Sequence, residues 1–204
     1  TDLTWKNEAG TKITTLKIDA KGVVRVTATS GSKSKTVYVV SKEKDETEYV
    51  LFEADFSKYS AISQLKAEGW KFLNSDSVYS FKDGTFVLGS LSDGYARVIL
   101  PEWLGDFGDY AISTDLKMLT TSDNGRWVGV VYRIQNENGN YYPYYHLCAR
   151  EKTTGGGVEF TERTSSNNWN VVLKTSSDIT SLKNKYQNFT VRAMGKKISH
   201  EING

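Results

Sequence analysis

The sequence has few of the residues that build disulfide frameworks, transition-metal centres or membrane spans. Its 204 residues include one cysteine, Cys148, and two histidines that stand far apart, His146 and His200. A single cysteine excludes an internal disulfide, and isolated histidines disfavour a transition-metal site. No apolar run approaches the roughly 20 residues that cross a bilayer, so no membrane insertion is expected. Cys148 lies within an apolar–polar alternation and is interpreted as a small strand residue rather than a nucleophile.

An excess of one charge sign is also missing. The chain has 26 basic and 24 acidic residues, interspersed, with a net charge of +2. This balance gives no reason to expect a nucleic-acid partner. Hydrophobic residues make up 38% and aromatic residues 12%, which is enough for a packed core and argues against general disorder. Proline occurs only at positions 101 and 143, so most strands can donate fully to their ladders.

Apolar and polar residues alternate along most of the chain, as they do in half-buried strands. The clearest runs are Val24–Ala28, Val37–Val39, Phe86–Leu88 and Val128–Ile134. Turn sequences separate the runs, at 82–84, 92–94, 138–140, 155–157 and 165–168. Short strands at this spacing predict an all-β fold, a sandwich or a barrel.

One short helix is predicted among the strands. Ser60 is the expected N-cap, Ile62 and Leu65 share a face, and Gly69 supplies the left-handed stop. A charged, apolar-free run follows the first strands at residues 42–48 and predicts an exposed linker. We therefore expect an N-terminal segment over 1–41 and a larger domain over 49–204.

The N-terminal segment reads as three strands separated by turns at Lys21-Gly22 and Ser30–Ser32. Its stretches Ile18-Asp19, Gly22–Val24, Val26–Gly31 and Val37–Val40, with Trp5 ahead of them, resemble the C-terminal half of a bacterial group-two immunoglobulin-like domain. The resemblance implies a partial Ig-like β segment that acts as a spacer in a secreted or cell-surface bacterial protein. It also implies an upstream half of that domain.

The larger domain opens with an apolar strand, the short helix, a Gly-Trp strand and an Asp83-Gly84 turn. Later strands read GDYAISTDL at 108–116, GVVYR at 129–133 and FTVRA at 189–193, followed by Ile198. Together these resemble concanavalin A-like sandwiches, including laminin-G-like modules and 3-keto-disaccharide hydrolases. The resemblance implies a two-sheet antiparallel jelly roll, with one more strand expected after Gly204. Fold alone does not imply function.

Three predicted strands, at 126–135, 144–150 and 158–163, have one apolar and one polar face. The polar face carries the predicted ligand-binding residues Trp127, Arg133, Gln135, Tyr144, His146, Arg150, Glu159 and Arg163. Flat rings contact the apolar face of a sugar, and arginine and glutamate hold its hydroxyls. Gly129 would let a ligand approach the backbone. The alternative is a solvated sheet face with cross-strand ion pairs.

Two further features leave alternatives open. The aromatics Trp103, Tyr141, Tyr142 and Trp169 lie near turns, where they either form a binding rim or cap the edges of the core. Residues 106–109 and 122–125 offer oxygen ligands that suit a structural calcium ion, but both are also ordinary turn sequences. No other cofactor is expected.

Catalysis is disfavoured by the placement of carboxylates. A retaining glycosidase needs two of them about 5 Å apart. Glu159 has none two residues away, and the E-x-D-x-x-E match at 43–48 lies in the charged run, where carboxylates keep ordinary acidity. We therefore expect a non-catalytic carbohydrate-binding module joined to other domains. The alternatives are a keto-disaccharide hydrolase-like glycosidase using Glu159, Arg133 and His146, and a structural or protein-binding sandwich.

Overall fold

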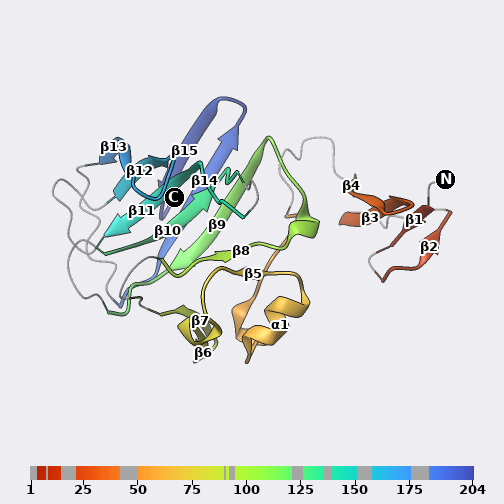
Figure 1. Cartoon of the computed structure of the whole chain (residues 1–204), viewed down its shortest axis with the longest axis horizontal. Helices are drawn as coiled ribbons and strands as arrows, with labels where there is room; N and C mark the ends of the chain where they lie inside the picture. Colours follow the sequence, from red (N-terminus) through yellow and green to blue (C-terminus); the bar gives the residue numbers. More distant parts are fainter. Residues whose placement is uncertain are drawn as a thin grey trace. The chain divides into compact units, whose positions relative to one another are not determined.

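The computed structural model of the chain divides into two compact units, Thr1–Asp106 and Phe107–Gly204 (Figure 1). It describes residues 4–7, 9–14, 22–41, 50–89, 91, 95–120, 126–135, 139–150, 158–175 and 184–204. Antiparallel strands dominate these residues, and one short α-helix lies among them, so the predicted all-β sandwich class is confirmed. None of the helices in the described ranges has the length and apolar character of a membrane span.

The first unit begins with a four-stranded antiparallel sheet in the order β2-β1-β3-β4. Its strands are β1 (Thr4–Lys6), β2 (Lys12–Ile13), β3 (Gly22–Ser30) and β4 (Lys33–Ser41). Ser30 pairs with Lys33, so Gly31 and Ser32 form a two-residue hairpin loop, as the turn sequence predicted. Gly31 has φ of +60°, a conformation that favours glycine. The linker predicted at 42–48 lies outside the described residues, and the domain boundary placed there stays a prediction.

The rest of the first unit is built from short elements. These are η1 (Phe56–Lys58), α1 (Ile62–Ala67), β5 (Lys71–Phe72), η2 (Asp76–Val78), β6 (Tyr79–Lys82), β7 (Thr85–Leu88), β8 (Val98–Ile99) and η3 (Glu102–Leu104). β5 pairs with β8, and β6 pairs with β7. The β6–β7 turn has positive φ at both Asp83 and Gly84, the backbone that a tight Asp-Gly hairpin requires.

The predicted helix exists, but its N-cap is Ala61 rather than Ser60. The side chain of Gln64 accepts hydrogen bonds from the backbone N–H groups of Ser60 and Ala61 at 2.8 and 3.0 Å. A glutamine in the first turn therefore satisfies the donors, and no capping hydroxyl is needed at Ser60. Leu65 is fully buried, and Gly69 ends the helix with φ of +96°, as predicted.

An aromatic core holds these short elements together. The ring of Phe86 lies within 6.1 Å of the rings of Phe56, Phe72, Tyr79 and Phe81. Such ring pairs add about 0.5–1.5 kcal/mol each beyond the apolar area that they bury. Aromatic packing thus takes the place of a large sheet in this part of the unit.

The second unit contains two antiparallel sheets, ordered β10-β11-β12-β13 and β15-β14-β9 (Figure 1). The strands are β9 (Tyr110–Leu116), β10 (Trp127–Tyr132), β11 (Tyr144–Arg150), β12 (Val158–Arg163), β13 (Asn170–Thr175), β14 (Gln187–Met194) and β15 (Lys197–Ile202). Their core consists of Met118, Val130, Tyr132, Leu147, Ala149, Val158, Phe189 and Val191. Because one face of each sheet contributes to this core, the opposite face of β10–β12 carries the remaining side chains.

Candidate functional site

Strand register gathers most of the predicted binding residues on the face of β10–β12 opposite the core. Trp127 lies opposite Arg150, and Tyr144 lies opposite Arg163. His146 pairs across β11 and β12 with Thr161. We call the group the polar aromatic cluster; its members are Trp127, Tyr142, Tyr144, His146, Arg150, Glu159, Thr161, Arg163 and Trp169.

His146 lies at the base of the cluster. Its ring is fully buried, 4.3 Å from the ring of Trp127 and 5.7 Å from that of Trp169. Nδ1 lies 3.3 Å from the Thr161 hydroxyl, whereas buried Nε2 has no hydrogen-bond partner among the described residues. Burial, with the charges of Arg163 and Arg150, lowers the pKa of His146 to about 3. The imidazole is therefore neutral at physiological pH.

Glu159 is the carboxylate of the cluster. Its Oε2 accepts a hydrogen bond from Nη2 of Arg150 at 3.2 Å and another from the indole N–H of Trp169 at 3.3 Å. The Glu159 side chain is 7% exposed and that of Arg150 is 18% exposed. A carboxylate this deeply buried needs such partners, because desolvation otherwise disfavours its charge.

A second guanidinium lies on the other side of the cluster. Arg163 is buried, and its Nη2 donates to the backbone oxygen of Ser166 at 2.5 Å. Its Cζ lies 5.0 Å from the ring centroid of Trp169 and 5.9 Å from that of Tyr142. Tyr142 in turn stacks on buried Tyr144 at 5.3 Å. Arg163 thus packs its charge between aromatic rings.

Gly129 permits β10 to lie close to β11 beneath this cluster. A Cβ at this position would lie 2.8 Å from Cα of Cys148 and 3.0 Å from Nε2 of His146. Any larger residue would therefore collide with the neighbouring strand and the imidazole. The glycine predicted to admit a ligand instead admits the strand β11 and the ring of His146.

Two predicted site residues lie elsewhere. Arg133 follows the last residue of β10 and has φ of +52°, and its guanidinium donates to the backbone oxygen of Gly195 at 2.7 Å. Gln135 is exposed, beyond the end of the strand. Period-two alternation placed both on the cluster face, but the alternation stops where the strand stops at Tyr132.

The cluster has a buried and a partly exposed layer. His146, Thr161, Glu159 and Arg163 are buried, and the Arg150–Glu159 pair is a cross-strand ion pair of the kind that the alternative of a polar sheet face expected. Trp127, Tyr142, Arg150 and Trp169 remain partly exposed. A ligand would therefore contact the partly exposed side chains first. The buried side chains support those exposed side chains from below. Trp169 and Tyr142, predicted only as general rim aromatics, contribute rings to the cluster.

The structure also bears on the candidate metal ligands, the carboxylate motif at 43–48 and the cysteine. Within the described ranges, no three His, Cys, Asp or Glu side chains are grouped as metal ligands. Asp109, from the first calcium candidate, accepts a hydrogen bond from the backbone N–H of Gly195 at 2.6 Å; residues 122–125 lie outside the described ranges. The Glu43–Glu48 motif also lies outside them. Burial raises the pKa of the Cys148 thiol to about 12, which opposes a nucleophilic role.

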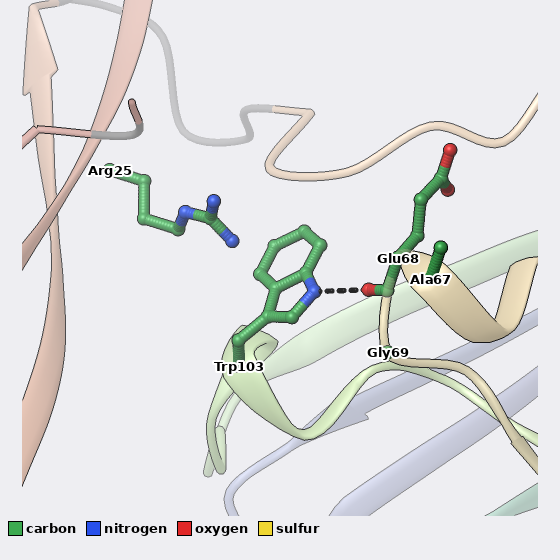
Figure 2. Close-up of a pocket in the computed structure, with 5 residues that line it drawn as sticks. All are labelled: Arg25, Ala67, Glu68, Gly69 and Trp103. Carbon is green, nitrogen blue, oxygen red and sulfur yellow. Dashed lines mark hydrogen bonds between the residues drawn. The ribbon is translucent and has the colours of Figure 1, made fainter. Parts of the chain in front are cut away.

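A pocket of about 360 Å³ lies in the first unit, lined by Arg25, Ala67, Glu68, Gly69 and Trp103 (Figure 2). The guanidinium of Arg25 lies 3.8 Å from the ring centroid of Trp103. The indole N–H of Trp103 donates to the backbone oxygen of Glu68 at 2.6 Å, the bond drawn in Figure 2. The arginine and the indole therefore contact each other, and Trp103 serves packing in this unit.

Comparison with known proteins yields no match: no protein-family model, curated protein or solved structure matches this chain. The resemblances to concanavalin A-like and immunoglobulin-like domains therefore stay predictions.

Proposed function

We propose that residues 107–204 bind a saccharide, without catalysis, on the polar aromatic cluster. One observation carries the proposal: the rings of Trp127 and Trp169 lie 5.7 Å apart, next to the Arg150–Glu159 ion pair. Aromatic rings beside fixed polar groups are the two elements that sugar recognition requires.

The two indole rings suit the faces of a pyranose. Their planes are tilted by 51°, and both rings are partly exposed. A sugar ring stacked on one indole would contact the other with its edge. The C–H bonds of the sugar would then lie on apolar surface, and its hydroxyls would point toward polar atoms at the rim.

The buried layer supports the exposed one. His146 packs against both indole rings, and Glu159 bonds the indole N–H of Trp169. Contacts of this kind hold the rings in place before a ligand arrives, which lowers the entropic cost of binding.

The carboxylates favour binding over hydrolysis. Glu159 lies in the cluster, whereas Glu162 alternates to the opposite side of β12 and bonds the side chain of Asn170 at 3.3 Å. Arg150 and Trp169 both bond the same oxygen of Glu159. Two carboxylates facing one sugar, the requirement of a retaining glycosidase, are not found among the described residues of the cluster.

We extend the proposal to cellular context on the strength of the sequence resemblances alone. Residues 1–41 would act as a spacer, and the whole chain would belong to a secreted or cell-surface bacterial protein with further domains. Fractionation of the native host and immunodetection of the chain would test this part.

A glycan array followed by titration calorimetry tests the proposed function. Trp127→Ala should weaken binding to any glycan hit by about tenfold or more, because it removes one stacking surface. Trp5→Ala is the matched control, since Trp5 is exposed on β1 of the other unit.

Two results would contradict the proposal. A folded protein that binds no glycan supports a structural or protein-binding sandwich. Glycan turnover that disappears in Glu159→Gln supports the glycosidase alternative.

A further inference from the structure

Resting on this proposed function, we propose that Nε2 of His146 forms a hydrogen bond with one hydroxyl of the bound saccharide. His146 would then be the residue that distinguishes one sugar from another, whereas the indole rings accept many. Three properties of this imidazole point to that role: its burial, its bonding and its neighbour in β10.

Nε2 of His146 is a buried polar atom that the fold leaves unpartnered. The side chain is 0% exposed, and Nε2 has no hydrogen-bond partner among the residues that the structure describes. The second histidine of the chain differs, because Nε2 of His200 lies 2.8 Å from the hydroxyl of Tyr132. Most buried polar atoms have a partner, since a buried atom without one costs free energy. A ligand group that bonds Nε2 would remove this cost.

Packing accounts for the ring of His146 but not for its Nε2 atom. The imidazole lies 4.3 Å from the ring of Trp127 and 5.7 Å from that of Trp169. A phenyl ring of similar shape could make these contacts without burying two nitrogens. Only Nδ1 is bonded within the fold, and its 3.3 Å distance from the Thr161 hydroxyl is long for a hydrogen bond. The nitrogen on the other side of the ring therefore suits a role in recognition.

Nε2 lies beside a position of β10 that has no side chain. β10 is the edge strand of its sheet, and Gly129 is partly exposed. A Cβ on Gly129 would come within 3.0 Å of Nε2, so the glycine keeps the space next to this nitrogen free of side-chain atoms. The nearby indole of Trp127 is also partly exposed. A side-chain adjustment of that indole, common when ligands bind, would uncover Nε2 to a hydroxyl at the edge of a stacked sugar.

A hydroxyl is the sugar group that suits this nitrogen. Burial lowers the pKa of His146 to about 3, so at neutral pH the ring is uncharged and carries one N–H. If Nδ1 accepts the Thr161 hydroxyl proton, Nε2 is a donor; if Nδ1 donates to Thr161, Nε2 is an acceptor. A hydroxyl pairs with either form, whereas a carboxylate can only accept and an ammonium group can only donate.

Nitrogen NMR of the full chain tests the contact directly, because the chain has two histidines. The probes are the methyl glycosides of glucose, galactose, mannose and N-acetylglucosamine, with the monodeoxy analogues of each one that binds. A bound glycoside should shift the Nε2 resonance of His146. The resonance of His200 Nε2, already bonded to Tyr132, is the internal control and should stay unchanged. One monodeoxy analogue should fail to shift the His146 resonance and should bind tenfold or more weakly.

His146→Phe identifies the group responsible. It keeps an aromatic ring against both indoles but removes the two nitrogens, so the melting temperature should change little. The parent glycoside should then bind as weakly as the critical monodeoxy analogue, whose own affinity should stay the same. His200→Gln, at the other buried histidine, is the matched control and should keep the tenfold discrimination.

The outcomes separate this inference from the proposed function. Glycoside binding that is lost in Trp127→Ala but leaves the Nε2 resonance of His146 unshifted overturns the role of His146 and leaves saccharide binding intact. Discrimination that survives in His146→Phe also overturns that role, because another group would then hold the hydroxyl. No binding of any glycoside, and no hit on the glycan array, overturns both.

Discussion

The two units of this protein both concentrate aromatic rings, but they surround those rings with different neighbours. In Thr1–Asp106, Phe86 contacts Phe56, Phe72, Tyr79 and Phe81, and rings pack on rings. In Phe107–Gly204, the ring of Trp169 has two guanidinium groups, an imidazole and a carboxylate around it.

This difference separates a core from a candidate site. Ring-on-ring packing supplies stability and needs no partner outside the chain. Burying arginine, glutamate and histidine costs free energy that stability alone does not require, since well-packed apolar residues often serve as well. The polar neighbours, rather than the aromatic content, therefore mark the second unit as the place to look for function.

The largest expected effect is on the aromatic core of the first unit. Phe86→Ala should lower the free energy of unfolding of this unit by about 2–3 kcal/mol, because it removes a ring packed on four others. Urea-dependent hydrogen exchange reports the two units separately. Leu88→Ala is the control, since Leu88 is 44% exposed on the same strand. If Phe86→Ala lowered the free energy of unfolding equally in both units, Phe86 would not belong to a core of the first unit alone.

The next largest effect is a loss of folding stability at acid pH, and it should be confined to the second unit. Both histidines lie there, and burial lowers the pKa of His146 to about 3 and of His200 to about 4. Below pH 6.5 the unfolded chain takes up protons that the folded unit does not, so stability falls as pH falls. Between pH 7.0 and 5.5 the loss should be about 2 kcal/mol.

The same exchange measurement at the two pH values tests this expectation. His200→Gln should remove about half of the pH dependence, because one of the two titrating groups is gone. A flat profile in the second unit would contradict the buried, neutral state of both imidazoles. Loss of stability in the first unit over this range would have another cause, because that unit has no histidine.

The smallest effect compares one indole N–H in each unit. Trp103→Phe removes a bond to the backbone oxygen of Glu68, and Trp169→Phe removes a bond to the carboxylate of Glu159. Each should cost about 1 kcal/mol of stability in its own unit. Only Trp169→Phe should also weaken glycan binding in calorimetry. If both variants weakened glycan binding equally, Trp169 could not be distinguished as a binding residue from Trp103 as a packing residue.

Much of the sheet structure could be predicted from alternation and turn chemistry. The hairpins at Gly31 and at Asp83-Gly84 formed where the sequence predicted them. The predicted apolar face of the strands, which contains Val130 and Leu147, also lies in the core. These features depend on neighbours within a few residues, and such local preferences are written directly in the chain.

The candidate site was predicted less completely. Strand phase put His146, Arg150 and Glu159 on one face, but it extended β10 too far and so included Arg133 and Gln135. Trp169 could not be assigned to the cluster, because the loop at 165–168 decides where its ring lies. A signal existed in the sequence: Trp169 follows closely after β12, the strand that carries Glu159 and Arg163.

By itself, the sequence determined the all-β class, the tight hairpins and which side chains share a strand face, because period-two alternation and turn residues act over short distances. The tertiary structure alone decided that the polar face is buried, that His146 is neutral, and that Trp169 contacts Arg150 and Glu159. Burial and charge interactions depend on residues distant in sequence, and these meet only when strands and loops pack together.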